Sequence, residues 1–503
     1  NDGSIYIESS WVNSNGSLIV EGSPSGIGTV SYKRFLREGD DTGDKHLLAS
    51  PVDGQDVTDF ISAFDSKIDS VRIWNEFEGV WERIESGQFV SGQGYNIYQA
   101  DNSDGEFTFS GSLVNSATFT ATSPYADPYL SRPATDRYGN TDPTQITWTT
   151  DRGYISEAWA NWGGGGWNLL GNPFTSAMNA DQFITVNASD FDPYYQALYV
   201  YDGKNGYYRY VATVVPGYDQ QGDPEFIQGG TFGNRIQAGQ GFLVMANNNE
   251  VEFDFSPAMQ AHQTALPLLK SASVEEPWPG LKLKVKWGEK ENLTTIVFND
   301  VMKNSLDPGY DVGLLSTGPE VEIYTTLVEK DEAINLTRQA LPVAGADTLK
   351  IPVGIDCYAG AEVTFSAYTI PMGNRRFWLE DRTAGTFTDL SLKGYTVTLP
   401  ENTFGTGRFY IIASTNTPTA IKPTIRDNGD LRIWVARNMI VLKGNASQDA
   451  RCELFDVNGK RILERQLTDG ELNTIDIPAG LHGIYLVRVI DRQVITTRKI
   501  VIL

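Results

Sequence analysis

Apolar and polar residues alternate in short runs along most of this chain. Residues 281–287 (LKLKVKW) alternate without a break, and similar runs recur between residues 294 and 413. Alternation with a period of two predicts half-buried β-strands, and the Gly, Pro and Asn residues between the runs predict turns. Helical spacing is scarce, and only residues 55–67 and 177–184 favour a turn or two of helix. The pattern predicts an all-β protein with several antiparallel β-sandwich-like domains in tandem.

Two segments of the chain carry the same motifs in the same order. LLASPV at 47–52 corresponds to LLGNPF at 169–174, and Gly-Gln-Gly at 92–94 corresponds to Gly-Gln-Gly at 239–241. An acidic-aromatic stretch and an aromatic hairpin lie between these motifs in both segments. Gly-x-Gly before an aromatic strand lets one backbone approach another. The second copy has an insertion over residues 215–235, which we expect to be a surface loop.

A chain of 503 residues is too long for one hydrophobic core. Residues 262–279 and 415–424 are rich in Pro, Ser or Thr, which predicts linkers. The repeat and the linkers together predict a β domain over 1–115 with the first copy, a β domain over 116–262 with the second copy, a β-sandwich over 278–416 and a terminal domain over 422–503.

The net charge of −23 narrows the choice of partners. Binding nucleic acid requires clustered Lys and Arg, so we expect no nucleic-acid partner. The acidic residues either keep an exposed protein soluble or bind divalent cations in acidic loops. Asp101 and Asp104 offer hard oxygens in a turn-forming loop, but they do not fit the EF-hand spacing. Ca²⁺ is therefore an alternative to simple Asx turns, and no other cofactor or metal is expected.

Candidate catalytic residues are scarce. His46, His262 and His482 do not lie at metal-ligand spacings, and Gly-x-Ser-x-Gly is absent. Cys357 and Cys452 lie in different predicted domains and form no disulfide framework, so we expect small buried side chains. The sequence predicts no catalytic residues and a protein that is not an enzyme, unless a catalytic domain precedes residue 1.

Aromatic residues are plentiful and can stack on sugar rings. The candidate glycan contacts are Trp159, Trp162 and Trp167. The alternative is packing in a core or in cross-strand ladders. No apolar run reaches the roughly 18 residues that span a bilayer. No signal peptide opens the chain at Asn1, so we expect either a removed leader or a longer protein.

The C-terminal residues carry a specific resemblance. LFDVNGK at 454–460, IPAGL at 477–481, GIYLVR at 483–488 and KIVI at 499–502 closely resemble the type A sorting domain of the type IX secretion system of Bacteroidetes. The resemblance implies an Ig-like sandwich that serves as an export address. The residues of this sorting signal are Gly459, Gly480, Gly483, Tyr485, Val487, Arg488, Lys499, Ile500 and Val501. A Tyr-Pro-Asn-Pro-like start is absent near 421–431, which leaves the beginning of the domain less defined.

The same resemblance implies the partners of the protein. They are the type IX translocon, an outer-membrane shuttle protein and a sortase that transfers the cargo to lipopolysaccharide. Arg488, Arg492, Arg498 and Lys499 can present a basic face to such a partner. WNLLGNPF at 167–174 resembles modules of large adhesin-like surface proteins. Ser70 and Thr348 match the Asp-Ser/Thr-apolar pattern that Bacteroidetes O-glycosylate.

These observations predict a secreted protein, located at the cell surface or outside the cell. Its cargo portion is expected to be adhesive or structural and to contact surface glycans. One alternative is the accessory region of a secreted polysaccharide hydrolase or protease whose catalytic domain precedes residue 1. A carbohydrate-binding module that acts alone is the other alternative.

Overall fold

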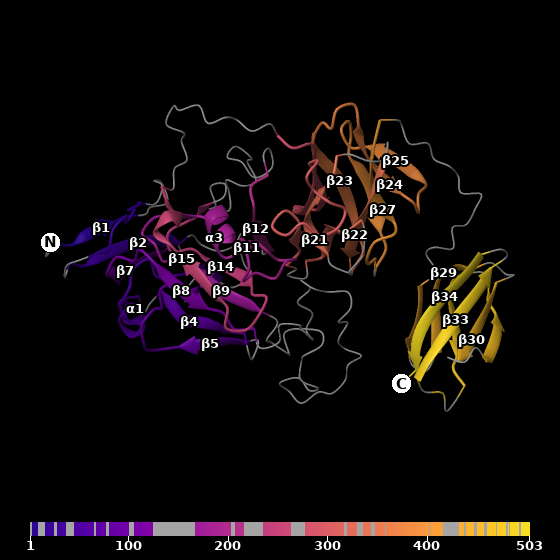
Figure 1. The fold of residues 1–503 in the computed structure, drawn as a ribbon, viewed down its shortest axis with the longest axis horizontal. Helices are drawn as coiled ribbons and strands as arrows, with labels where there is room; N and C mark the ends of the chain where they lie inside the picture. The colour runs from indigo at the N-terminus through magenta and orange to yellow at the C-terminus, as the bar shows by residue number, and fades with distance from the viewer. Residues whose placement is uncertain are drawn as a thin grey trace. The chain divides into compact units, whose positions relative to one another are not determined.

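The structure, a computed structural model, divides the chain into two compact units, residues 1–418 and residues 419–503 (Figure 1). Strands dominate both units, which confirms the predicted all-β class. The finer boundaries predicted inside the first unit stay predictions. The described residues are 3–8, 16–24, 28–36, 45–64, 67–76, 80–99, 105–123, 166–202, 207–215, 235–262, 277–315, 319–328, 335–343, 348–357, 359–401, 403–415, 432–436, 439–446, 450–456, 460–468, 470–478, 481, 483–491 and 494–502.

Each repeat copy forms short strands and one short helix. The first copy contains β1 (Ile5–Ile7), β2 (Val30–Leu36), β3 (Lys45–Leu48), α1 (Val57–Ala63), β4 (Ile68–Asn75), β5 (Val80–Ile84), β6 (Tyr95–Gln99) and β7 (Gly105–Gly111). The second contains β8 (Ala117–Thr120), β9 (Trp167–Gly171), β10 (Ala177–Asn179), α3 (Ala180–Val186), β11 (Leu198–Asp202), β12 (Tyr207–Val211), β13 (Arg235–Ile236), β14 (Gly241–Met245), β15 (Glu252–Phe255), the 3-10 turn η2 (Pro257–Met259) and β16 (Gln260–Ala261).

The two copies have the same strand order in their central sheets, as an internal repeat predicts. Their four-stranded sheets run in the order β3-β6-β4-β5 and β9-β14-β11-β12. Outside these sheets, β2 pairs with β7 and β8 pairs with β15, antiparallel in both cases. The helices begin at equivalent caps, where the side chains of Asp56 and Asn179 each accept a hydrogen bond from a backbone N–H of the first turn.

The copies dock against each other through equivalent backbone atoms. The Ala49 N–H donates to the Gly239 carbonyl at 2.9 Å, and the Gly171 N–H donates to the Gly92 carbonyl at 3.0 Å. Ala49 and Gly171 hold the same place in the repeat, as do Gly92 and Gly239. A Cβ on Gly94 would lie 2.5 Å from the Leu170 carbonyl oxygen, closer than non-bonded atoms approach. The second glycine of the motif therefore makes room for the other copy.

Aromatic side chains fill the space on the docking side of the two sheets. The cross-strand pairs Trp74–Trp81 and Tyr201–Tyr208 occupy equivalent hairpins, each with ring centroids 5.2 Å apart. Both pairs pack against a buried cluster that includes residues of both copies, among them Leu47. Aromatic pairs of this kind, edge-to-face for the tryptophans and tilted for the tyrosines, stabilise a fold beyond the area they bury.

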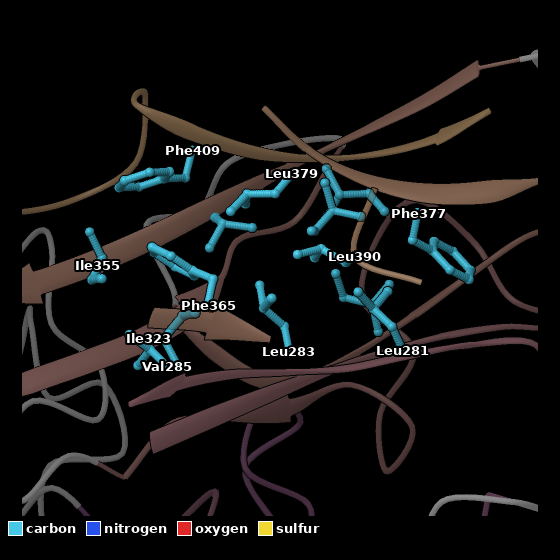
Figure 2. Close-up of a cluster of buried hydrophobic side chains, with 14 of the residues drawn as sticks. Leu281, Leu283, Val285, Ile323, Ile355, Phe365, Phe377, Leu379, Leu390 and Phe409 are labelled. Carbon is cyan, nitrogen blue, oxygen red and sulfur yellow. The ribbon is translucent and has the colours of Figure 1, made fainter. Parts of the chain in front are cut away.

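The rest of the first unit is one sandwich-like β domain around a large apolar core. Leu283, Phe365 and Phe409 are among the side chains that converge there (Figure 2). The strands are β17 (Gly280–Trp287), β18 (Lys290–Phe298), β19 (Val312–Gly313), β20 (Val321–Thr325), β21 (Leu336–Leu341), β22 (Thr348–Cys357), β23 (Ala361–Ile370), β24 (Arg376–Asp381), β25 (Thr386–Asp389), β26 (Tyr395–Leu399) and β27 (Phe409–Ser414).

Most strand pairs are antiparallel, as the alternation predicts. Two pairs depart from the prediction, because β1 lies parallel to β2 and β18 lies parallel to β21. The described strands β17 to β27 form one hydrogen-bonded sheet that continues around the core, with β25 and β26 at its ends. Mixed sheets of this kind are common when strands distant in sequence become neighbours.

A buried arginine joins the second repeat copy to this domain. Arg338, in β21, is fully buried. Its guanidinium donates to the carbonyl oxygens of Gly309 (2.7 Å) and Tyr310 (2.9 Å), and to that of Thr213 (3.0 Å) in the second copy. A buried charge is tolerated where acceptors replace water. The contact therefore fixes the second copy against the sandwich.

The C-terminal unit is a smaller sandwich of two sheets. Its described strands are β28 (Arg432–Ala436), β29 (Met439–Ala446), β30 (Arg451–Asp456), β31 (Arg461–Gln466), β32 (Gly470–Asp476), β33 (Gly483–Asp491) and β34 (Val494–Ile502). The sheets run β28-β29-β32 and β31-β30-β33-β34. This antiparallel, two-sheet arrangement agrees with the Ig-like sandwich that the resemblance implies.

We expect Asn96→Leu to raise the free energy of unfolding by roughly 1–3 kcal/mol. Asn96 is fully buried, and neither amide atom has a hydrogen-bond partner among the described residues. Leu243 holds the equivalent place in the second copy and is also buried, so a leucine occupies the corresponding position of the repeat. Urea denaturation measures the change.

The matched control is Leu243→Asn, which should lower the free energy of unfolding because it adds an amide to the same kind of buried site. If Asn96→Leu destabilises the protein as well, the amide of Asn96 has a partner in solution and the prediction is wrong.

Candidate functional site in the C-terminal sandwich

The resemblance places the candidate site in the C-terminal unit, where the inward face of the sheet β31-β30-β33-β34 meets the other sheet. Cys452 and Leu454 point into this core from β30. The predicted sorting residues Tyr485, Val487 and Ile500 belong to the same core. Their position follows from the alternation of β33 and β34. These three residues build the domain and lie beneath its surface.

A buried carboxylate organises the outward face of the same sheet. Glu453, in β30, is 1% exposed and lies directly opposite Arg488 of β33. Arg488 donates to the Glu453 Oε2 from Nη2 at 2.6 Å and from Nε at 2.7 Å. Arg461 of β31 reaches Oε1 at 3.2 Å. The guanidinium of Arg488 also lies 4.6 Å from the centre of the Phe455 ring. The three strands are thus tied together by charge-assisted hydrogen bonds.

This network sets the protonation state of Glu453. Burial alone would raise the pKa of the carboxyl group, but hydrogen bonds from Arg488 and Arg461 outweigh burial and hold the pKa below its ordinary value. The carboxylate therefore stays ionised at neutral pH. Arg488 is committed to an internal partner, so its structural role is to balance the charge of Glu453.

The remaining residues of the predicted sorting signal lie along the last two strands or outside the described residues. Gly483 opens β33, and Lys499 and Val501 lie in β34. Gly459 and Gly480 fall outside the residues that the structure describes. Their roles in sorting stay predictions.

Both cysteines are buried and free, as predicted. Burial, with a smaller contribution from Glu453, raises the pKa of Cys452 to about 12. Burial also raises the pKa of Cys357. Because the thiolate is the reactive form, neither thiol is activated as a nucleophile.

The candidate glycan contacts are only partly described. Trp167 is 5% exposed, and the rings of Tyr195 and Tyr199 meet it edge-on with centroids 5.3 Å away. This is the packing arrangement that the sequence left as the alternative to sugar stacking. Trp159 and Trp162 lie outside the described residues, so glycan contact in this region stays a prediction.

The two candidate O-glycosylation residues have different surroundings. The Ser70 side chain is buried and its hydroxyl donates to Asp69, which argues against modification of the folded protein there. Thr348 is exposed at the start of β22. Asp101 and Asp104 lie outside the described residues. Within the described ranges, no group of three or more His, Cys, Asp or Glu could hold a metal ion, and no helix could cross a membrane.

Sequence reasoning missed the two buried charges that organise the fold, Arg338 and Glu453. The signal for Glu453 was present, since β30 and β33 carry opposite charges at facing positions. Only the register of β30 against β33 shows that Glu453 and Arg488 face each other. Arg338 offered no such signal, because the three acceptors that its guanidinium reaches at Gly309, Tyr310 and Thr213 are backbone carbonyls.

Comparison with known families divides the chain much as the structure does. The family model described as a domain of unknown function (DUF8693) matches residues 8–412. The model described as a secretion system C-terminal sorting domain matches residues 436–503. No curated protein matches the chain. The second match supports type IX export and interaction with the type IX machinery.

We expect Glu453→Gln to destabilise the C-terminal unit by about 1–3 kcal/mol, since it removes the charge from a buried acceptor of Arg488 and Arg461 and leaves Arg488 without its carboxylate. The loss should be largest above the unfolded pKa of about 4.3. The native contribution of Glu453 disappears as pH falls through its lowered folded pKa, so the two proteins should converge in acid. Hydrogen exchange of β30 and β33 measures the difference.

The matched control is Glu464→Gln in the same sheet, whose carboxylate pairs with Arg461 at the surface at 2.7 Å. Exposed pairs contribute about 0–1 kcal/mol. Equal effects of the two substitutions would contradict the role given to Glu453.

Proposed function

Because this chain belongs to the family described as a domain of unknown function (DUF8693) and ends in a secretion-system sorting domain, we propose that it is an adhesive or structural cargo protein of the type IX secretion system. The sorting domain itself makes the protein a type IX cargo that reaches the cell surface or the extracellular space. The role of the body that it carries is the proposal.

The division of the chain into two compact units carries this proposal. The first unit joins two docked repeat copies to a sandwich through buried contacts, including those of Arg338. Such a body withstands force on the cell surface better than loosely linked domains, because its parts separate only when buried groups are exposed. The second unit has a core of its own and is suited to serve as a separate handle.

We also propose that the body has no catalytic role, because its buried polar groups serve the fold. Burial raises the pKa of Asp311 to about 7, but its carboxylate oxygens accept hydrogen bonds from the backbone N–H groups of Ala340 and Asp307, each at 2.7 Å. A perturbed pKa often marks an active site, but it also accompanies structural networks. This arrangement favours the structural role.

The proposed partners follow from the sorting domain. The translocon and an outer-membrane shuttle protein would recognise the C-terminal unit, and a sortase would transfer the body to lipopolysaccharide. On the surface the body would contact glycans. A handle that folds separately from the body would allow removal without disturbing the cargo, and among the described residues the core of the C-terminal unit and the core of the sandwich have no member in common.

Removal of residues 419–503 should leave the body in the periplasm. The experiment compares a strain with the full protein, a strain with residues 1–418 and a strain that lacks the protein. Only the full protein should reach the surface, and only that strain should gain adhesion to a panel of immobilised glycans. Cell fractionation and adhesion counts give the two readouts.

The control is protease resistance of the periplasmic body, which separates failed export from failed folding. A folded body that reaches the surface without residues 419–503 contradicts the export role. Equal adhesion by all three strains contradicts the adhesive role but leaves export intact.

A further inference from the structure

The last strand of the C-terminal unit lies at a sheet edge (Figure 1). Among the described strands, β34 exchanges ladder hydrogen bonds only with β33. The strand β28 of the other sheet is close to β34, but the two form no hydrogen-bonded pair. One side of β34 therefore has no ladder partner within the described part of the unit.

This edge is long and regular. The nine residues of β34 pair with β33 from Gly483–Ile502 to Asp491–Val494 without a shift of register. The opposite edge strand, β31, has six residues, and its pairing with β30 contains a register shift. Proteins usually shorten, bend or interrupt an exposed edge because it offers a template for another strand. The strand β34 lacks those interruptions.

The composition of β34 suits strand addition. The strand has the sequence VITTRKIVI, with no Pro or Gly, and all residues except Arg498 and Lys499 are β-branched. β-Branched residues favour extended backbone, and an edge without proline keeps its N–H groups as donors. Addition of an extended segment to such an edge is a common mode of peptide recognition.

The charges on β34 indicate what kind of strand fits. Arg498 and Lys499 lie at the centre of the strand, which contains no acidic residue. Antiparallel pairing of two β34 strands about their central residue would place Arg498 opposite the Arg498 of the second copy, and facing like charges destabilise a sheet. A strand with acidic residues would instead gain electrostatic attraction.

We propose that the free edge of β34 is a docking site for an extended, acidic segment of the export machinery, which adds to the sheet as a further strand. The inference rests on the proposed recognition of the C-terminal unit by that machinery. It assigns the recognition to backbone hydrogen bonds along the edge together with Arg498 and Lys499.

The test is to pair the edge of β34 with a strand that is added to the protein itself. The full protein receives, after Leu503, an Asn-Gly turn and nine residues of alternating Thr and Glu, which can fold back onto β34. The control carries an extension of equal length made of Gly and Ser. The capped protein should accumulate in the periplasm, whereas the control should reach the surface. Hydrogen exchange of β34 in the purified proteins shows whether the added strand has paired.

A second variant decides the question if the added strand does not pair. Arg498→Glu with Lys499→Glu should block export, and the control Arg465→Glu, at an exposed residue of the opposite edge strand β31, should not. Normal export of a capped protein whose β34 is protected, or of the double variant, overturns this inference. If removal of residues 419–503 still blocks export in that case, the proposed function survives. If that truncated protein is exported as well, both fail.

Discussion

Two backbone hydrogen bonds, from Ala49 to Gly239 and from Gly171 to Gly92, connect the repeat copies at equivalent positions. These hydrogen bonds can form only because the residues at which the two backbones meet, Gly94 in the first copy and Gly241 in the second, have no side chain. A Cβ at Gly94 would meet the Leu170 carbonyl, and a Cβ at Gly241 would meet the backbone of Leu47 at 2.7 Å. Close packing of backbones is a steric constraint that no other residue satisfies. The aromatic cluster between the sheets depends on this approach.

Each compact unit also contains a buried charge that joins its parts. Arg338 joins the second copy to the sandwich, and Glu453 joins three strands of the C-terminal unit. Neither group needs a ligand to explain its burial, since each has acceptors or donors at hydrogen-bond distance. Arg338 and Glu453 are thus both engaged in the architecture of the domains that hold them. This pattern suits a cargo whose task is to remain folded outside the cell.

The sequence predicted the strands that cover one face of a core. Alternation located β17 and β23, and turn residues marked their ends. It failed for β21 (LTRQAL), because all six residues are buried and Arg338 and Gln339 interrupt the apolar pattern. Motif order predicted the repeat, but periodicity does not tell which surfaces meet, so the docking of the copies was not predicted. The pairing of Arg488 with Glu453 was missed for the same reason, because it depends on strand register.

The most direct test of this account is the stability of Gly94→Ala. Its added methyl group would lie against the Leu170 carbonyl, whereas a methyl group at Gly22 would meet no atom within 4 Å. Relative to Gly22→Ala, we expect Gly94→Ala to lower the free energy of unfolding by about 1–3 kcal/mol in urea denaturation, since overpacking forces the backbone to move. We also expect faster hydrogen exchange in both repeat copies. Equal stability of Gly94→Ala and Gly22→Ala would contradict the claim that reciprocal backbone contact holds the body together.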